Sequence, residues 1–252
     1  MLNADFHVHT VMSGHAFCTF NECAAAACEK GLSVIAITDH GPAMQGSVHE
    51  GYFEMSPRLP KQFGSLVVLF GCEANIVNTR GELDLSDNTM SGLDIVLVGL
   101  HEKTPYLEMS EANNTKAIVS AIERNACINI VSHPFRAEFP VSIIDVTFTA
   151  IEHHVLLEIN THLIEKAIGN YQEKRSRQVI ENTAKMVEIL QGKNKGYVIN
   201  SDAHHTSEIG ISDDVLEKLK NILGISEEYI LNNNLELLSN YIPALRKWRC
   251  KM

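Results

Sequence analysis

Two histidines separated by a single residue, His7 and His9, are the first side chains in this chain that could carry chemistry. They lie on and just beyond an apolar run, residues 2–8, that predicts a β-strand. Side chains alternate between the two faces of a strand, so residues two positions apart project to the same side. Two converging imidazoles suit a borderline divalent metal ion such as zinc. The pair therefore indicates a metal site, although two histidines at this spacing also occur by chance.

The same arrangement recurs along the chain: a β-rich apolar run ends, and a side chain that can bind a metal stands at or just beyond its carboxyl end. Any one of these histidines would more simply be a structural histidine of the core or of a loop. Their repeated placement at strand ends is what favours a shared metal site. The candidate metal ligands are His7, His9, His15, His40, Glu73, His101, His133, Asp202 and His204.

The elements that must position these residues alternate between strand and helix patterns about seven times, which is typical of a parallel α/β sheet. The predicted strands span residues 2–8, 33–38, 66–72, 94–100, 128–132, 155–159 and 196–200. The predicted helices span residues 19–30, 58–63, 111–125, 142–154 and 171–191. Thr19 and Glu22 have the spacing of a capping box at the start of the first helix. A hairpin is expected at residues 74–85, and helices from residue 212 are expected to cover one end of the fold.

A closed barrel accounts for the candidate ligands better than an open sheet. The ligands come from nearly every strand end, and only a closed ring brings those ends together around one point. An open sheet would spread them along a row and place a site mainly at its switch point. We therefore expect an α/β barrel of the TIM type, with the metal site at the carboxyl ends of its strands. The length of 252 residues suits one such domain, residues 1–252.

The composition argues against several classes of function. A net charge of −10 speaks against broad electrostatic binding of nucleic acid. No apolar run approaches the ~18 residues that span a bilayer, and the first residues lack the pattern of a secretory signal. Six cysteines without a C-x-x-C spacing, Cys250 among them, predict free thiols in a reducing compartment. We therefore expect a cytoplasmic protein with no membrane partner and no strong nucleic-acid partner, its oligomeric state being left open.

Taken in order, the motifs of this chain resemble those of the PHP superfamily, named for polymerase and histidinol phosphatase, and within it the small bacterial three-metal phosphatases. The resemblance runs from residue 5 to about residue 210. The family fold is a distorted seven-stranded (βα) barrel, which agrees with the count of predicted strands. The motifs are His7-Val-His9, His15, Thr38-Asp39-His40, Gly71-Cys-Glu73-Ala-Asn75, Gly99-Leu-His101-Glu102, Ser132-His133-Pro134, Glu158-Ile-Asn160 and Ser201-Asp202-Ala-His204.

The resemblance implies about three divalent metal ions, expected to be zinc with manganese or iron as alternatives. Glu73 would bridge two of these ions. The implied assignment gives the first ion His7, His9, Glu73 and Asp202, the second Glu73, His101 and His133, and the third His15, His40 and His204.

The expected cluster suits an anionic substrate. Three divalent ions contribute six positive charges and two carboxylates remove two, so the site would carry about +4. A metal-bridging water whose pKa falls from 15.7 towards ~7 would attack phosphorus as hydroxide, so no protein nucleophile is needed. The expected enzyme is a metal-dependent phosphatase that hydrolyses a small phosphomonoester. Histidinol phosphate, another sugar or amino-alcohol phosphate, and a nucleotide are the substrates left open.

Arg136 is the predicted substrate-binding residue. It follows His133 by three positions, so its guanidinium should reach the rim of the metal site and bind two phosphate oxygens in a fork. The alternative is a surface arginine paired with Glu138.

Three other functions are weighed against a phosphatase. An amidohydrolase also begins with His-x-His on a barrel strand, but its bridge is often a carboxylated lysine where this chain has Glu73. A phosphodiesterase or nuclease would need a basic groove with interleaved aromatic residues, and the sequence shows none. A non-catalytic metal-binding module would usually have lost ligands, whereas this set is complete.

Overall fold

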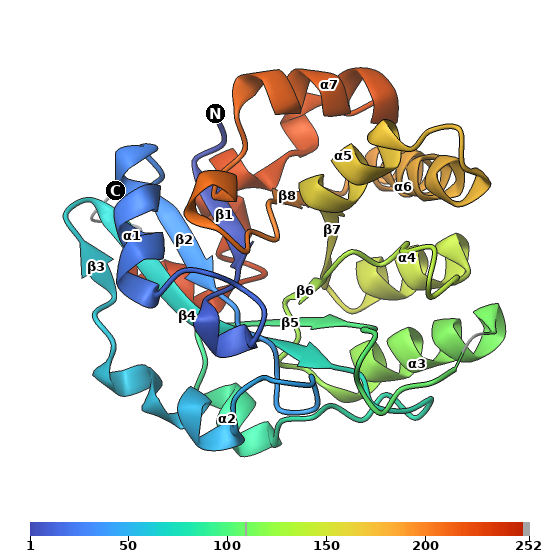
Figure 1. Cartoon of the computed structure of the whole chain (residues 1–252). Helices are drawn as coiled ribbons and strands as arrows, with labels where there is room; N and C mark the ends of the chain where they lie inside the picture. The colour runs from blue at the N-terminus through green and yellow to red at the C-terminus, as the bar shows by residue number, and fades with distance from the viewer. Residues whose placement is uncertain (109, 249–252) are drawn as a thin grey trace.

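The computed structural model describes residues 1–108 and 110–248, and its centre is a nearly closed barrel of seven parallel strands (Figure 1). The strands follow one another around the barrel in the order β1, β2, β4, β5, β6, β7 and β8. A short antiparallel strand, β3 at Gln62–Phe63, pairs with β4 outside this ring. The seven strands are β1 Ala4–Val8, β2 Val34–Ile37, β4 Leu66–Asn75, β5 Ile95–Gly99, β6 Ile130–Val131, β7 Leu156–Asn160 and β8 Val198–Asn200. The predicted α/β barrel is confirmed.

The barrel closes between β1 and the chain that follows β8. The His9 amide donates to the Ala203 carbonyl at 2.9 Å, and the Ala203 amide donates to the His7 carbonyl at 3.3 Å. Lower in the barrel the Phe6 amide donates to Oδ1 of Asn200 at 3.0 Å. The two ends of the barrel sequence, which carry the first and the last candidate ligands, are therefore joined directly by backbone hydrogen bonds.

Helices surround this ring and cover the outer faces of the strands (Figure 1). The capping box predicted at Thr19 and Glu22 is present at the start of the first helix. The α-helices are α1 Phe20–Glu29, α2 Asp87–Ser91, α3 Glu111–Arg124, α4 Ile143–Glu152, α5 Thr161–Gly169, α6 Lys174–Gly192, α7 Asp213–Leu223 and α8 Leu235–Leu238. The 3₁₀-helices are η1 Val11–Ser13, η2 Glu50–Arg58, η3 Thr206–Glu208, η4 Glu227–Tyr229, η5 Leu231–Asn233 and η6 Pro243–Trp248.

No helix among the described residues is long and apolar enough to cross a membrane. The five cysteines that the structure describes are all free thiols, as predicted, and Cys250 lies outside the described residues.

Several predicted boundaries are wrong for local reasons. The helix predicted at residues 58–63 is absent: η2 ends at Arg58 and β3 follows it. Pro60 lacks an amide donor and disfavours helical backbone at Leu59, whose ψ of 140° is extended. The structure also contains α5, which the sequence reading left out, and α6 starts at Lys174 rather than residue 171. The predicted hairpin at residues 74–85 is present in a short form: Ile76 and Leu83 make an antiparallel bridge, and backbone hydrogen bonds from Val77 to Glu82 and from Asp84 to Asn75 flank it.

The longest strand, β4, changes partners halfway along, and this change positions Glu73. Its residues 67–70 pair with β2, and its residues 71–75 pair with β5. At the change, a Cβ atom on Gly71 would lie 2.1 Å from the carbonyl oxygen of Ile95, so only glycine fits there. Glu73 is thus inside the strand, not beyond its end as predicted, and the tight approach at Gly71 holds it beside β5.

The inner surface of the barrel changes from apolar to polar along the strands. Leu156 of β7 belongs to the inner apolar core, and Glu158, two residues further on, projects to the same side. In β8 the inward-facing residue likewise changes from apolar Val198 to polar Asn200, two positions further on. Period-two alternation therefore places carboxylates and amides in a buried layer directly above the apolar layer, at the carboxyl end of the barrel.

The chain after α7 closes the opposite, amino-terminal end of the barrel. Leu238, Ile242 and Leu245 have no exposed surface and pack in one cluster with inward-facing strand residues such as Phe6. The prediction that helices from residue 212 cover one end of the fold is therefore correct for the chain after α7, whereas α7 itself packs against α6. We call Leu238, Ile242 and Leu245 the plug. Since the plug lies at the end of the barrel away from the candidate ligands, we expect it to contribute to the stability of the fold.

We expect Leu238→Ala to lower the free energy of unfolding by ~2–5 kcal/mol, because it leaves a cavity in the closed end of the barrel. Leu237→Ala is the matched control: Leu237 precedes it in α8 but is 46% exposed. Denaturant unfolding at fixed metal concentration measures both variants. Equal losses in the two variants would show that the plug does not close a packed core.

Candidate metal centre

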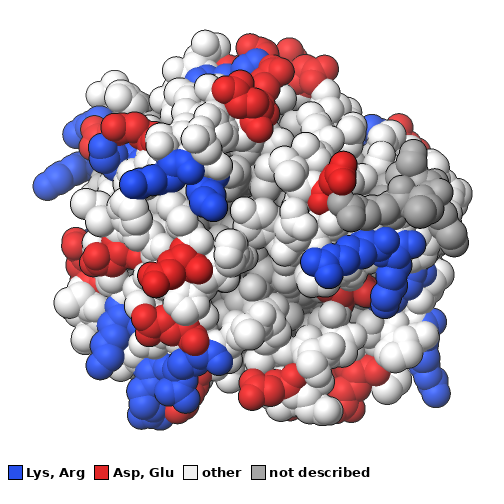
Figure 2. Space-filling view, turned by 180° about the vertical axis from the view of Figure 1, so that it is seen from behind, with Lys and Arg blue, Asp and Glu red and all other residues white. Residues whose placement is uncertain are grey.

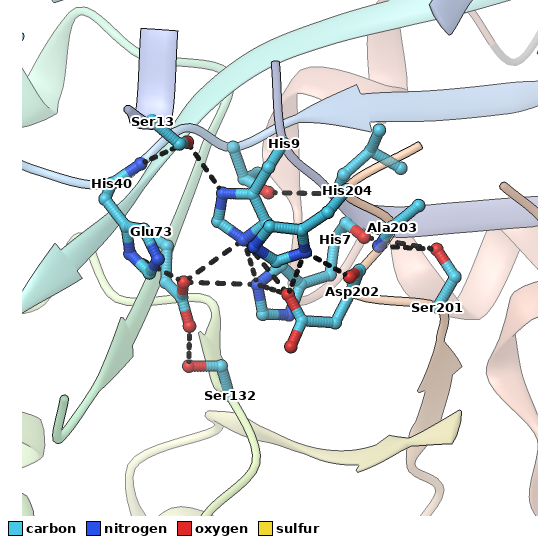
Figure 3. A network of polar contacts seen from close by, with 12 residues as sticks. His7, His9, Ser13, His40, Glu73, Ser132, Ser201, Asp202, Ala203 and His204 are labelled. Carbon is cyan, nitrogen blue, oxygen red and sulfur yellow. Dashed lines mark hydrogen bonds and ion pairs between the residues drawn. The ribbon is translucent and has the colours of Figure 1, made fainter. Parts of the chain in front are cut away.

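The carboxyl ends of the barrel strands bring most of the predicted ligands together in one cluster. Figure 3 shows part of it, with His7, His9, His40, Glu73, Asp202 and His204. Among the described residues, four groups of three side chains have ligand atoms within 4.8 Å of one another. Their role as metal ligands stays a prediction, but the expected convergence is present. The groups are His9, His40 and His204; His7, Glu73 and His133; His7, His9 and Asp202; and His40, Glu73 and His101.

Glu73 is buried at the centre of the cluster, and its two oxygens face different imidazoles. Its Oε2 lies 3.2 Å from Nε2 of His7 and 3.4 Å from Nε2 of His9. Its Oε1 lies 3.0 Å from Nε2 of His101 and 2.9 Å from Nε2 of His133. A carboxylate with one group of histidines on each oxygen has the arrangement required of a bridge between two ions.

Asp202 and His204 approach the cluster from the loop after β8. Oδ1 of Asp202 lies 3.1 Å from Nε2 of His9 and 3.3 Å from Nε2 of His7. Nδ1 of His204 is 2.8 Å from the carbonyl oxygen of Asp202, to which only a protonated ring nitrogen can donate. The other ring nitrogen of His204 is then left with its lone pair, as a metal ligand requires.

His15 differs from the other candidates because it follows η1 in a loop and does not stand at a strand end. Its side chain is exposed, and it lies outside the four groups of converging ligand atoms. Its ring centroid is nevertheless 5.1 Å from that of His40 and 4.9 Å from that of His204. The loop therefore places His15 at the edge of the cluster, next to His40 and His204, the other two predicted ligands of the third ion.

Two buried atoms that face into the cluster lack hydrogen-bond partners, Nδ1 of His40 and Oε2 of Glu73. They are 3.0 Å apart, but their geometry is not that of a hydrogen bond. A buried polar atom without a partner is unfavourable, and a cation between such atoms would satisfy both. Ligand atoms around tetrahedral zinc are about 3.3 Å apart for bonds of ~2.0–2.1 Å. The unpartnered atoms, the spacing and the donor types all fit a divalent metal.

Other side chains make hydrogen bonds with the ring nitrogens of the candidate ligands that point away from the cluster. Oε1 of Glu158 is 2.8 Å from Nδ1 of His7, and Oδ1 of Asn75 is 2.7 Å from Nδ1 of His101. Glu158 and Asn75 belong to two of the motifs that resemble the PHP superfamily, but the sequence did not predict a role for either. A signal for Glu158 was present: a carboxylate inside a buried apolar strand is costly unless it is paired.

The backbone is strained at two candidate ligands. His133 has a φ of 28° and Asp202 a φ of 58°, a region that residues other than glycine rarely adopt. Oε2 of Glu158 accepts a hydrogen bond from the His133 amide at 2.8 Å. Nδ2 of Asn160 donates to Oδ2 of Asp202 at 3.1 Å. The β7 side chains thus stabilise the two bends that aim these ligands at the cluster.

Burial and charge set the protonation of the cluster without metal. Burial lowers the pKa of His7, but the surrounding carboxylates, Glu158 foremost, outweigh it and hold that pKa well above 6.5. Burial likewise opposes charge on His9, and neighbouring carboxylates raise its pKa to about 9. Burial raises the pKa of Glu73, but the adjacent imidazoles hold it well below its usual range. For His40 burial prevails and lowers the pKa well below 6.5.

A cavity of about 440 Å³ opens above the cluster, and Arg136 lies on its wall; that it binds substrate stays a prediction. The Arg136 guanidinium is 3.3 Å from Oε2 of Glu102 and 3.5 Å from Oε2 of Glu138. The alternative pairing with Glu138 is therefore also present. Lys103 and Lys166 line the same cavity and add positive charge to it.

Comparisons with known proteins agree with this geometry. The sequence matches the PHP domain over residues 5–188. A protein of Caldanaerobacter subterraneus subsp. tengcongensis named "Probable phosphatase" is 35% identical over 247 residues, which is 96% of this chain and 92% of that protein. A Proteus mirabilis protein of the same description is 33% identical over 246 residues, 97% of this chain and 95% of that protein.

Among solved structures, the histidinol phosphate phosphatase of Lactococcus lactis subsp. lactis, complexed with zinc, L-histidinol and phosphate, has a similar fold. The TM-score is 0.58 at 16% identity, and the alignment covers 88% of this chain and 92% of that one. At this identity the similarity concerns the fold alone.

The pKa shifts predict how the metal-free protein responds to alkaline pH. Above about pH 7.5 the histidines of the unfolded chain are neutral, whereas folded His7 and His9 with raised pKa values still carry protons. Their pairing with Glu73 and Asp202 stabilises the fold and is lost as the pH rises through about 9. The free energy of unfolding of chelator-treated protein should fall by about 1–3 kcal/mol per pH unit across this interval.

Zinc should reverse this trend, because metal binding requires neutral imidazoles and therefore releases the protons of His7 and His9. Calorimetric unfolding between about pH 7.5 and 9, with and without zinc, measures both curves. A metal-free protein whose stability stays constant or rises over this interval would contradict the assigned protonation.

Proposed function

The chain belongs to the PHP domain family, and from this premise we propose that it is a metal-dependent phosphatase that hydrolyses a small phosphomonoester. The observation that carries the proposal is the position of Glu73, whose two oxygens face separate groups of imidazoles. The names of the relatives support a phosphatase, and the zinc and phosphate in the Lactococcus lactis enzyme support metal-dependent chemistry on a phosphate ester.

We propose that the nine side chains hold about three divalent ions, with zinc preferred. Imidazole nitrogen and carboxylate oxygen are ligands that zinc shares with manganese and iron. The proposed assignment is His7, His9, Glu73 and Asp202 for the first ion, Glu73, His101 and His133 for the second, and His15, His40 and His204 for the third. The proximity of His9 to His40 and His204 places it at the boundary of the first and third groups.

When bound, the ions would supply Lewis acidity and a water whose pKa falls towards ~7, so that it can serve as the nucleophile. The nine ligands include only two carboxylates, so the site keeps an excess of positive charge that attracts phosphate. Arg136 on the cavity wall would bind the phosphate oxygens through its guanidinium, and Lys103 and Lys166 would add to the attraction. A cavity of about 440 Å³ suits a small molecule.

The alternative functions have less support. Glu73 takes the bridging position that a carboxylated lysine occupies in many amidohydrolases. A nuclease would need a continuous basic surface, whereas among the described residues of the face shown in Figure 2 lysines and arginines stand in small groups among acidic side chains. A non-catalytic module would have no need of an open cavity lined with cations above a complete ligand set.

The test is a panel of phosphomonoesters with protein purified without chelator and supplied with zinc or manganese. We expect hydrolysis of at least one small phosphomonoester. Glu73→Gln should lower metal content and reduce kcat/KM at least about a hundredfold, since even supporting residues of metal sites cost 10–100-fold. Glu181→Gln, an exposed position on α6, is the matched control. Metal-loaded protein with no phosphatase activity, or a fully active Glu73→Gln variant, would contradict the proposal.

A second prediction concerns Arg136. Arg136→Ala should lower kcat/KM for the phosphomonoester by roughly thirty- to a hundredfold, the equivalent of ~2–3 kcal/mol for a charge-assisted contact, and leave metal content intact. Arg136→Lys should recover only part of this loss, because an ammonium group cannot reproduce the fork.

Arg80→Ala serves as the control, because Arg80 is an exposed arginine paired with Glu82 away from the cavity. Hydrolysis of a neutral carboxylic ester should change little in any of these variants. If kcat/KM is the same in both Arg136 variants as in the unmodified protein, its role is the structural pairing with Glu102 and Glu138.

A further inference from the structure

Ser13 is a fully buried residue that lies beside His9 and His40 at the edge of the cluster and is not itself a candidate ligand (Figure 3). It ends η1, the single turn between β1 and the loop of His15. Its hydroxyl oxygen has three partners: Oδ1 of Asp39 at 2.6 Å, Nδ1 of His9 at 2.8 Å and the amide nitrogen of His40 at 3.2 Å. One oxygen atom therefore connects two candidate ligands with a buried carboxylate.

The chemistry of these groups fixes the direction of each hydrogen bond. A carboxylate only accepts, so the Ser13 hydroxyl donates its proton to Asp39. The oxygen lone pairs then accept from the His40 amide and from the His9 ring, which must carry hydrogen on Nδ1. In the neutral form of His9 that binds metal, the Nε2 atom is left with its lone pair, and this is the atom that faces Glu73 and Asp202. Ser13 thus selects the tautomer of His9 that can bind metal.

Hydrogen bonds fix the position of the Asp39 carboxylate, so that it can accept the Ser13 hydroxyl hydrogen. It has no exposed surface, and it accepts hydrogen bonds from the Thr10 amide at 2.7 Å and the Thr10 hydroxyl at 2.8 Å. The Tyr52 hydroxyl donates to it at 2.9 Å. With Ser13 as the fourth donor, both carboxylate oxygens are engaged, and Asp39 hydrogen-bonds to no ligand ring. Its influence on the cluster passes through the Ser13 hydroxyl.

The His101 side of the cluster uses a parallel arrangement. Nδ2 of Asn75 donates to Oδ2 of Asp84 at 2.6 Å, so Oδ1 of Asn75 is the atom that accepts from the His101 ring at 2.7 Å. On the third side, Glu158 accepts from His7 directly. A carboxylate, alone or through one intermediate polar group, thus sets the ring orientation of three candidate ligands.

We propose that Ser13 and Asp39 are positioning residues that fix which ring nitrogen of His9 binds a metal ion and that couple His9 to the neighbouring ligand His40. This inference rests on the proposed metal centre. Loss of the Ser13 oxygen leaves the Nδ1 hydrogen of His9 buried without an acceptor, which favours the opposite tautomer with its hydrogen pointing at Asp202 and Glu73. Residues that orient metal ligands in this way typically contribute 10–100-fold to metal affinity.

The test is a zinc titration in competition with a chromophoric chelator, together with the visible absorption spectrum of the cobalt(II)-loaded protein. Ser13→Ala should weaken the affinity for at least one ion by about 10–100-fold and change the cobalt spectrum, which reports ligand geometry. Asp39→Asn should weaken zinc binding in the same direction, although it keeps the size of the side chain. Ser13→Cys, whose thiol is a weak acceptor, should restore part of the affinity and carries the test if Ser13→Ala fails to fold.

Ser239→Ala is the matched control. Ser239 is also fully buried, its hydroxyl donates to the carbonyl oxygen of Glu236 at 2.8 Å, and it lies beside the plug at the other end of the barrel. This variant should leave zinc affinity and the cobalt spectrum unchanged. Unchanged affinity and spectrum in a folded Ser13 variant would overturn the positioning role.

The same titration separates this inference from the proposed function. An unmodified protein that binds zinc but hydrolyses no phosphomonoester contradicts the phosphatase proposal, while the comparison with Ser13→Ala still decides the role of Ser13. An unmodified protein that binds no zinc overturns both.

Discussion

A buried carboxylate, Glu73, is the constraint on which the site depends. Only 1% of its surface is exposed, and a lone charge at such a position would be strongly destabilising. Imidazoles surround it on both oxygens and keep its pKa low. A charge so placed needs either protons on those histidines or metal ions between them. The two states exclude each other, because a ring nitrogen that binds a metal cannot carry a proton. The same geometry therefore links the stability, the metal content and the activity of the protein.

The barrel can accommodate the buried Glu73 carboxylate because the two ends of its strands differ: the amino end forms the apolar core and the carboxyl end forms the site. Its amino end is an apolar core sealed by Leu238, Ile242 and Leu245, so it stays closed without help from the site. Its carboxyl end replaces apolar side chains with a buried layer that includes Glu158 and Asn200. Asn200 donates a hydrogen bond to Glu158, and Glu158 accepts another from the candidate ligand His7. The stable end is thus free to support strained backbone at the other, where two candidate ligands have positive φ.

The sequence predicted the barrel and the convergence of its ligands because both follow from period-two alternation and from the order of strand ends. It did not predict α5, whose start depends on the Asn160 side chain capping the Leu163 amide at 2.9 Å. It also gave no role to Ser13, because the partners of its hydroxyl lie 26 or more residues away or across a turn of the loop. Local patterns identify which residues can bind metal, whereas the contacts that orient them arise only from the tertiary fold.

The most direct test of the central claim is anomalous diffraction at the zinc edge from crystals of the zinc-loaded protein. We expect two zinc peaks, each at a bonding distance of ~2.0–2.2 Å from a different oxygen of Glu73. A third peak should lie among His15, His40 and His204. A single peak bound to Glu73, or a Glu73 side chain that contacts no zinc, would contradict the bridging role of Glu73.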